Sequence, residues 1–365
     1  MESYSRRKNK KMIKALLWKS SQKLIKAQNK RIVIFGAGNT SELYVKCLKT
    51  EHITPFCWFD NDKRKIGNCV IWGGGSKIFS PDKIEKDMFV LISSRNRNMF
   101  DSISRQLDGI KIPYMGIDEY VFAKRTDELL SCIQLLEDDK SVEIFSELIR
   151  CRIKNLPIPD SVFEGNQYFC LPRFAAFNPK ETFVDCGAFC GDTTEQFIFK
   201  RFGSFNKIFA FEPDKKNFTA LKKRVARLTE EWALEENKII CIQAGIGLKT
   251  EQGSIEEKND AGSRISLTKD ITDCANTIMI YALDDYFKNQ CISFIKADIE
   301  SYEIDMLRGA ELTIKRDHPK LAIAIYHNAS DMYQILLYLH SLNAGYKFAI
   351  RHHTPDDYDT ILYAY

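Results

Sequence analysis

The chain has 365 residues, of which 44% are hydrophobic and 28% charged, with a formal net charge of +4 at pH 7. This length exceeds what one hydrophobic core usually fills, so we expect two domains, and no apolar run is long enough for a membrane-spanning helix. The eleven cysteines include no C-x-x-C pair, which argues against a disulfide framework or a zinc site and favours a reducing cytoplasm.

The first segment, residues 1–30, is strongly basic. Residues 1–31 hold eleven Lys and Arg against a single acid, Glu2, with apolar residues at helical spacing, which predicts a basic amphipathic helix. One interpretation is that its apolar stripe packs on the first domain. Another is that residues 6–31 contact a membrane surface, which would place the protein at the inner face of the membrane. Nucleic-acid binding is the third, but the helix alone does not support it, and we predict no nucleic-acid partner.

Residues 31–125 are expected to form a Rossmann-like nucleotide-binding-type domain. Apolar runs alternate with helical patterns, which is typical of a parallel sheet with crossover helices. The expected strands cover residues 31–35, 57–60, 88–93 and 110–115, with a helix over 40–49.

The glycine turn of this first domain suggests a second nucleotide site. Gly36 and Gly38 follow the first strand, and Asp60 lies 24 residues after Gly36, near the position expected of a ribose ligand. The third glycine of a dinucleotide fingerprint is missing. A turn retained for packing or for a homodimer is therefore an alternative, as is an oxidoreductase or epimerase.

Residues 126–365 are expected to form the second domain. Helical periodicity over 126–154 is interpreted as its N-terminal connector. Strands are then expected at 181–185, 207–211, 238–242, 277–281, 292–298 and 321–326, helices at 301–315 and 330–342, and a closing antiparallel pair at 346–350 and 360–365. A polar insertion that includes residues 262–265 separates the fourth strand from the third. The fold class is thus α/β, with two Rossmann-like domains.

The βαβ unit that begins at residue 181 carries the most informative motif. Asp185, Gly187 and Gly191 form the turn after its first strand, and Glu212 ends the second strand, 27 residues after Asp185. A backbone cradle and a carboxylate at these places suit a nucleoside ligand. Because Asp185 and Asp192 would repel a pyrophosphate, we expect a cationic cofactor without phosphate, a description that S-adenosylmethionine fits.

The next strand ends in residues that should lie at the same edge of the sheet, where an adenine would bind. The predicted cofactor-binding residues are Asp185, Gly187, Ala188, Gly191, Asp192, Glu212, Gln243 and Ala244.

Three further residues are candidates for a general base. Asp298 and Glu300 leave a strand at the same edge, and His327 ends the apolar strand that follows. A hydroxyl acceptor needs a group that takes its proton as it is methylated. Glu300 could instead cap a helix, and His327 could be a core imidazole. Such a set could also hold a divalent metal, but the spacing does not define a site, and we predict no metal.

Six strings follow one another in the second part of the chain: VDCGAFCGDT (184–193), FAFEPD (209–214), YALDDYF (281–287), IKADIESYEIDMLRGA (295–310), LAIAIYH (321–327) and RHHTPDDYDTILYA (351–364). This ordered series resembles the FkbM-type methyltransferases over residues 127–365. The resemblance implies a class I methyltransferase-type sheet and S-adenosylmethionine-dependent O-methylation, commonly of sugars in surface polysaccharides or glycolipids.

By the same resemblance, Asp185, Gly187 and Glu212 would bind the cofactor, and Asp298 and Glu300 would lie at the reacting centre. Ser301 stands where the family usually has glycine, so a left-handed backbone there would be strained. The expected partner is a carbohydrate or glycolipid acceptor. Rival functions are a nucleotide-sugar oxidoreductase or epimerase in the first domain, and a non-catalytic nucleotide-binding module.

Overall fold

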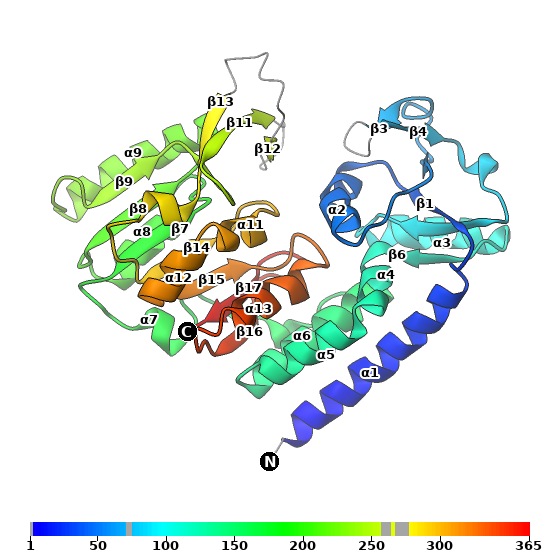
Figure 1. Cartoon of the computed structure of the whole chain (residues 1–365), viewed down its shortest axis with the longest axis horizontal. Coiled ribbons are helices and arrows are strands. Elements are labelled where there is room, and N and C mark those ends of the chain that lie inside the picture. The colour runs from blue at the N-terminus through cyan, green and yellow to red at the C-terminus, as the bar shows by residue number, and fades with distance from the viewer. Residues whose placement is uncertain (1–2, 71–74, 257–263, 267–276) are drawn as a thin grey trace. The chain divides into compact units, whose positions relative to one another are not determined.

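The computed structural model describes residues 3–70, 75–256, 264–266 and 277–365, and they fall into two compact units (Figure 1). The first unit comprises residues 1–163, 326–334 and 354–358. The second comprises residues 164–325, 335–353 and 359–365.

The first unit is built on an open sheet of six strands in the order β3-β4-β2-β1-β5-β6. The strands are β1 (Arg31–Phe35), β2 (Trp58–Phe59), β3 (Cys69–Val70), β4 (Ser76–Phe79), β5 (Met88–Ile92) and β6 (Tyr114–Gly116). All neighbours pair in parallel except β3, which is antiparallel to β4. The apolar strand β5 is buried throughout, and Ile103 and Leu107 of helix α3 pack on the face that carries Met88, Val90 and Ile92. The expected parallel α/β sheet is present.

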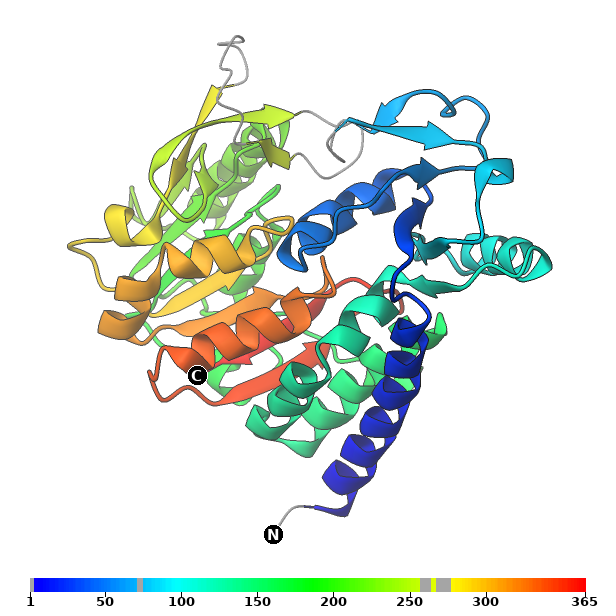
Figure 2. The same ribbon diagram turned by 45° about the vertical axis from the view of Figure 1, so that its right-hand side comes forward.

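Helices make up the rest of the first unit. They are α1 (Tyr4–Ile25), α2 (Asn39–Thr50), α3 (Arg97–Gly109), α4 (Ile117–Lys124), α5 (Thr126–Leu135) and α6 (Asp139–Lys154). The basic helix α1 runs alongside α4 and α6 (Figure 2) and buries Ile13 and Leu17 there. Its Ser20 hydroxyl donates to Glu119 of α4 at 2.8 Å. The apolar stripe of α1 therefore packs on the first unit. Among the described residues, no helix is long and apolar enough to span a membrane.

The helical segment 126–154 differs from the sequence expectation in two ways. It is two helices, since the Asp138 carboxylate accepts from the Ser141 N–H at 2.7 Å and caps α6. It also belongs to the first unit, and not to the second unit as expected from the sequence. The reason is its packing against α1 and α4, tertiary contacts that helical periodicity does not reveal.

The second unit is built on a seven-stranded sheet in the order β16-β17-β15-β14-β7-β8-β9. Its strands are β7 (Thr182–Cys186), β8 (Lys207–Phe211), β9 (Ile239–Ile242), β14 (Phe294–Ala297), β15 (Lys320–Ala324), β16 (Phe348–His352) and β17 (Thr360–Ala364). Strand β17 is antiparallel to β15 and β16, and the other pairs are parallel. The predicted fold class, including the closing antiparallel pair, is confirmed.

A smaller sheet of four strands, in the order β10-β13-β11-β12, also belongs to the second unit. Its strands are β10 (Gly245–Ile246), β11 (Glu251–Glu256), β12 (Arg264–Ser266) and β13 (Thr277–Tyr281). Strand β13 was expected from the sequence, but it pairs here and not in the main sheet. Of the expected polar insertion, residues 262 and 263 lie outside the described residues.

The remaining helices are α7 (Pro172–Ala175), α8 (Asp192–Lys200), α9 (Lys215–Glu231), α10 (Leu283–Tyr286), α11 (Glu303–Arg308), α12 (Glu311–Asp317) and α13 (Asp331–Ser341). The single helix expected over 301–315 is thus divided into α11 and α12. Gly309 lies at the break, where an added Cβ would approach the carbonyl oxygen of Gly247 to 2.2 Å. The close approach of these two backbones requires glycine at this position, and the carbonyl of Gly309 accepts from the N–H of Asp284 at 2.8 Å.

Candidate active site

The glycine turn after β7 lies at the centre of the sheet of the second unit, where β7 has β8 on one side and β14 on the other. The N–H groups of Gly187 and Ala188 donate to the carbonyl of Phe211 at 3.0 and 2.9 Å. Gly187 has a φ of +77°, and an added Cβ would lie 2.1 Å from the backbone oxygen of Asp298. This position therefore requires glycine, and it joins the carboxyl ends of three strands.

Glu212, directly after β8, faces this turn. Its Oε2 accepts from the N–H of Phe189 at 2.8 Å and its Oε1 from the N–H of Asp214 at 2.9 Å. Burial raises the pKa of Glu212 to about 7, against the effect of these hydrogen bonds. Each carboxylate oxygen can accept a second hydrogen bond. Glu212 therefore fits the role of acceptor for the two hydroxyls of a ribose.

Asp185 is a buried ion-pair partner and not a free charge at the rim. Lys296 of β14 lies opposite it in the sheet, with its Nζ 3.1 Å from Asp185 Oδ1, and the Thr194 hydroxyl donates to Oδ2 at 2.9 Å. Burial raises the pKa of Asp185, opposed by Lys296. Burial disfavours the charge on Lys296, but Asp185 and Asp298 raise its pKa. The expectation that Asp185 attracts a cationic cofactor is corrected accordingly, because Lys296 neutralises it.

Lys296 also supports the turn itself. Its Nζ donates to the carbonyl of Gly187 at 2.7 Å. Asp192, the other acid of the turn, is exposed in the first turn of α8, where it complements the helix dipole. Asp185 thus acts through Lys296 on the shape of the turn, and Asp192 is the acid that faces solvent.

Gln243 and Ala244 follow β9 at the same edge. The N–H of Glu212 donates to the carbonyl of Ile242 at 3.1 Å, so the end of β9 adjoins Glu212. Gln243 is exposed and Ala244 is buried. The structure thus brings the end of β9 to the side of Glu212 on which an adenine was expected.

Asp298 meets the glycine turn from β14. Its N–H donates to the carbonyl of Cys186 at 3.1 Å, and the hydroxyl of Tyr168 donates to its Oδ2 at 2.9 Å. Tyr168 fixes the Asp298 carboxylate next to the turn that would hold a methyl donor. Such a carboxylate can accept a hydrogen bond from an acceptor hydroxyl and take its proton.

The two residues after Ile299 adopt left-handed backbone conformations. Glu300 has a φ of +54° and Ser301 a φ of +76°. The conformation that the resemblance assigns to glycine is therefore present, with serine in its place. Such a backbone costs about 1–2 kcal/mol for a residue with a Cβ, and strain of this kind is typical of functional turns.

His327 belongs to the first unit, which includes residues 326–334. It is buried, and its ring lies against that of Tyr326 with centroids 4.1 Å apart. Asp298 and Glu300 belong to the second unit, so the role of His327 as a base stays a prediction.

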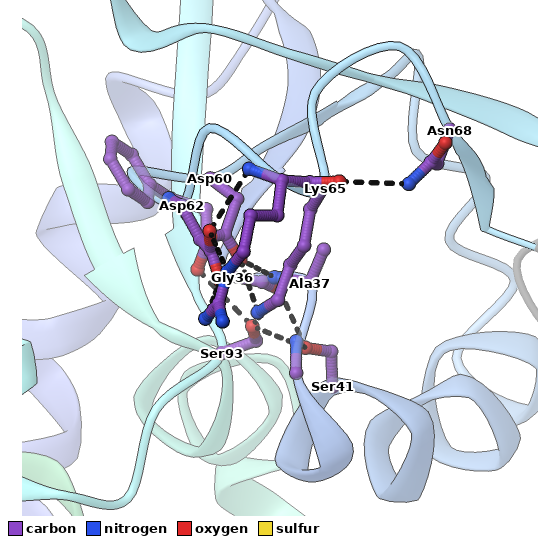
Figure 3. Close-up of polar contacts among 11 residues, drawn as sticks. Gly36, Ala37, Ser41, Asp60, Asp62, Lys65, Asn68 and Ser93 are labelled. Atoms are coloured by element: carbon purple, nitrogen blue, oxygen red, sulfur yellow. Dashed lines mark hydrogen bonds and ion pairs between the residues drawn. The ribbon is translucent and has the colours of Figure 1, made fainter.

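The glycine turn of the first unit is filled by its own side chains (Figure 3). Asp60 Oδ2 accepts from the N–H of Ala37 at 2.8 Å and pairs with Lys65 at 3.0 Å. The N–H of Gly38 donates to the Ser41 hydroxyl at 3.0 Å. These are the amides that would face a pyrophosphate in a dinucleotide site. The second nucleotide site at Gly36, Gly38 and Asp60 stays a prediction.

Comparisons with known proteins bear on the second unit. Residues 185–348 match the family described as Methyltransferase FkbM domain, while a comparison with curated protein sequences finds no match.

Among solved structures, the methyltransferase FkbM of Methylobacillus flagellatus is similar in fold, with a TM-score of 0.55 and 23% identity over 94% of this chain and 93% of its own. An rRNA methylase of Streptococcus thermophilus is less similar, with a TM-score of 0.35 and 15% identity over 55% of this chain and 96% of its own. A SAM-dependent methyltransferase of Aquifex aeolicus has a TM-score of 0.28 and 15% identity over 53% of this chain and 91% of its own. The family match confirms the resemblance that the sequence motifs indicate. Residues 185–348, just under half of this chain, thus match a methyltransferase domain of the FkbM family.

Proposed function

We propose that the second unit methylates a sugar hydroxyl of a surface glycan or glycolipid precursor. The observation that carries the proposal is the convergence of the Gly187 turn, Glu212 and Asp298 at one edge of the sheet. S-adenosylmethionine supplies an electrophilic methyl group on its sulfonium when bound. Glu212 would accept hydrogen bonds from its ribose, since each carboxylate oxygen can accept a second hydrogen bond beside that from Phe189 or Asp214.

The acceptor would be held by the carboxylates after β14. Asp298, oriented by Tyr168, and Glu300, on the left-handed turn, are the candidates that accept the proton of the hydroxyl. Holding an acceptor oxygen in line with a methyl carbon can contribute about 7–11 kcal/mol to the lowering of the barrier. A hydroxyl acceptor is favoured because the sequence Ala-Asp-Ile-Glu at 297–300 lacks the Pro-Pro-aromatic turn of enzymes that methylate amino groups of bases.

The experiment compares Glu300→Gln and Asp298→Asn with the wild type, and uses Glu311→Gln on α12 as a matched control. S-adenosylmethionine affinity, measured by titration calorimetry, should be unchanged in all. Transfer of labelled methyl to glycan extracts should slow by roughly 10²–10⁴ in the variant that lacks the base. Wild-type turnover in both site variants would reject a carboxylate base and direct attention to His327.

The acceptor class is tested in cells with and without this chain. Mass spectrometry of their glycans and glycolipids should show a difference of one methylene per modified sugar. If the difference is found in nucleic acid instead, the proposed acceptor is wrong. Bound NAD in the purified protein would favour the oxidoreductase or epimerase alternative. Tight S-adenosylmethionine binding without transfer to any pool would favour a non-catalytic module.

The setting of the enzyme is also a proposal. We infer a cytoplasmic protein, with a homodimer and contact with the membrane surface through residues 6–31 as further expectations. Because Ile13 and Leu17 of α1 are buried in the first unit, such membrane contact would depend on the lysines and arginines of its outer face.

A further inference from the structure

A polar cavity opens at the carboxyl edge of the sheet of the first unit, the edge at which open α/β sheets bind their ligands. Its volume is about 30 Å³. The polar residues that line it include Tyr44, Arg95, Asp118, Arg152 and Asn155. A larger opening of about 550 Å³ shares Arg95 and Arg97 with it, so the two adjoin. A ligand group in the small cavity would have room for its remaining body in the large one.

Arg152, on α6, has unused hydrogen-bond donors in this cavity. Its Nη2 donates to the carbonyl of Tyr326 at 3.0 Å. Among the residues that the structure describes, its buried Nε and Nη1 have no hydrogen-bond partner, and neither has Nδ2 of Asn155. A buried charged donor without a partner is costly, so such groups usually meet a water or a ligand. The fork of a guanidinium matches the oxygens of a phosphate or carboxylate.

The same cavity also holds a spare acceptor. In the described part of the chain, Oδ1 of Asp118 is buried without a hydrogen-bond partner. Its Oδ2 lies 3.9 Å from Nε of Arg95, which in turn donates to the Tyr44 hydroxyl at 3.3 Å. A simple anion would donate no hydrogen bond to the Asp118 carboxylate and would be repelled by its negative charge. A ligand with both an anionic group and a hydroxyl would satisfy both sides.

We infer that the first unit binds a phosphorylated sugar or nucleotide, with its phosphate on Arg152 and a hydroxyl on Asp118. The glycine turn of this unit is the other place for a phosphate, but the N–H groups of Ala37 and Gly38 are already occupied. The inference does not depend on methyl transfer by the second unit. Its alternative is water, since a cavity of this size holds about two molecules.

The test is titration calorimetry on the full chain without S-adenosylmethionine. The probes are inorganic phosphate, glucose 1-phosphate, UDP and uncharged glucose. We expect glucose 1-phosphate or UDP to bind more tightly than inorganic phosphate, and glucose not to bind. The tighter of the two identifies a sugar phosphate or a nucleotide as the ligand class.

Variants separate the two halves of the site. Arg152→Gln should weaken the tighter probe by roughly 10- to 100-fold, as expected for hydrogen bonds to a charged group. Asp118→Asn should weaken glucose 1-phosphate or UDP but not inorganic phosphate. The control is Arg105→Gln, because Arg105 is exposed on α3 and lines neither cavity. It should bind like the wild type.

Two results would overturn the inference. One is the absence of binding by every phosphate probe at millimolar concentration, which would leave water as the occupant. The other is unchanged affinity in Arg152→Gln. If Arg152→Gln fails to fold, Arg152→Lys keeps the charge and loses the fork, and it should still bind more weakly than the wild type. S-adenosylmethionine affinity, a property of the second unit, should be unchanged throughout, and this separates the failure of this site from failure of the proposed function.

Discussion

Replacing Gly187 by alanine places a methyl group against a neighbouring strand end. The added Cβ would lie 2.1 Å from the backbone oxygen of Asp298 and 3.0 Å from Cγ2 of Ile299. The left-handed φ of +77° costs about 1–2 kcal/mol for alanine. Because the obstacle is backbone, the end of β14 must shift, at a further cost of about 1–3 kcal/mol. We expect a loss of about 2–5 kcal/mol in the free energy of unfolding.

Gly345→Ala is the matched control. Gly345 has a φ of +74°, but an added Cβ would meet no described atom within 4 Å. It should lose about 1–2 kcal/mol, the conformational part alone. The assay is urea denaturation followed by circular dichroism, with S-adenosylmethionine affinity as a second readout. The affinity should fall only in Gly187→Ala, since a shift of Asp298 opens the turn. Equal losses of stability in the two variants, with equal affinities, would refute the close approach of β7 and β14 at this turn.

The remaining predictions concern the groups around the turn. Lys296→Met should lower the free energy of unfolding, measured with urea, by about 3–5 kcal/mol, because it leaves the Asp185 carboxylate buried without its ion-pair partner. Adding Asp185→Asn should recover part of this loss. Equal stability of Lys296→Met and the wild type would contradict the ion pair. Tyr168→Phe should lower kcat about 10- to 100-fold without changing S-adenosylmethionine affinity, since it removes the hydrogen bond that orients Asp298. An unchanged kcat would show that the orientation of Asp298 by Tyr168 does not contribute to catalysis. Burial raises the pKa of Glu212 from 4.5 to about 7, so the folded protein binds the proton of this carboxyl group more tightly than the unfolded chain does. The contribution of Glu212 to the free energy of unfolding therefore declines as the pH rises from about 4.5 to about 7. Urea denaturation across this range should show a smaller decline in Glu212→Gln, and the same slope in both proteins would show that Glu212 titrates normally.

The turn and Glu212 could be predicted from the sequence because they lie within one βαβ unit, where strand ends and spacing fix their relation. Lys296 was missed, although a lysine in an otherwise apolar strand was a usable signal. The pairing of Lys296 with Asp185 could not be predicted, because it depends on the register between β14 and β7. These strands are about 110 residues apart in the sequence. Tyr168 lies 130 residues from Asp298 and gave no signal.

The helical segments show the same division between local and tertiary information. Periodicity predicted helices over 126–154 and 301–315, but it did not reveal what they pack against. The first segment joins the first unit through α1 and α4. The second is interrupted at Gly309, where the backbone of Gly247 lies close against it. The sequence did not show whether Ser301 adopts the left-handed conformation that favours glycine. The backbone dihedral angles of the structure show that it does.

The most direct test of the central claim is titration calorimetry of S-adenosylmethionine against the wild type and Glu212→Ala. We predict one binding site per chain in the wild type and a loss of affinity of roughly 10- to 100-fold in the folded variant, as expected for hydrogen bonds to a carboxylate. Equal affinity in the two proteins would show that the edge formed by β7, β8 and β14 is not where the cofactor binds.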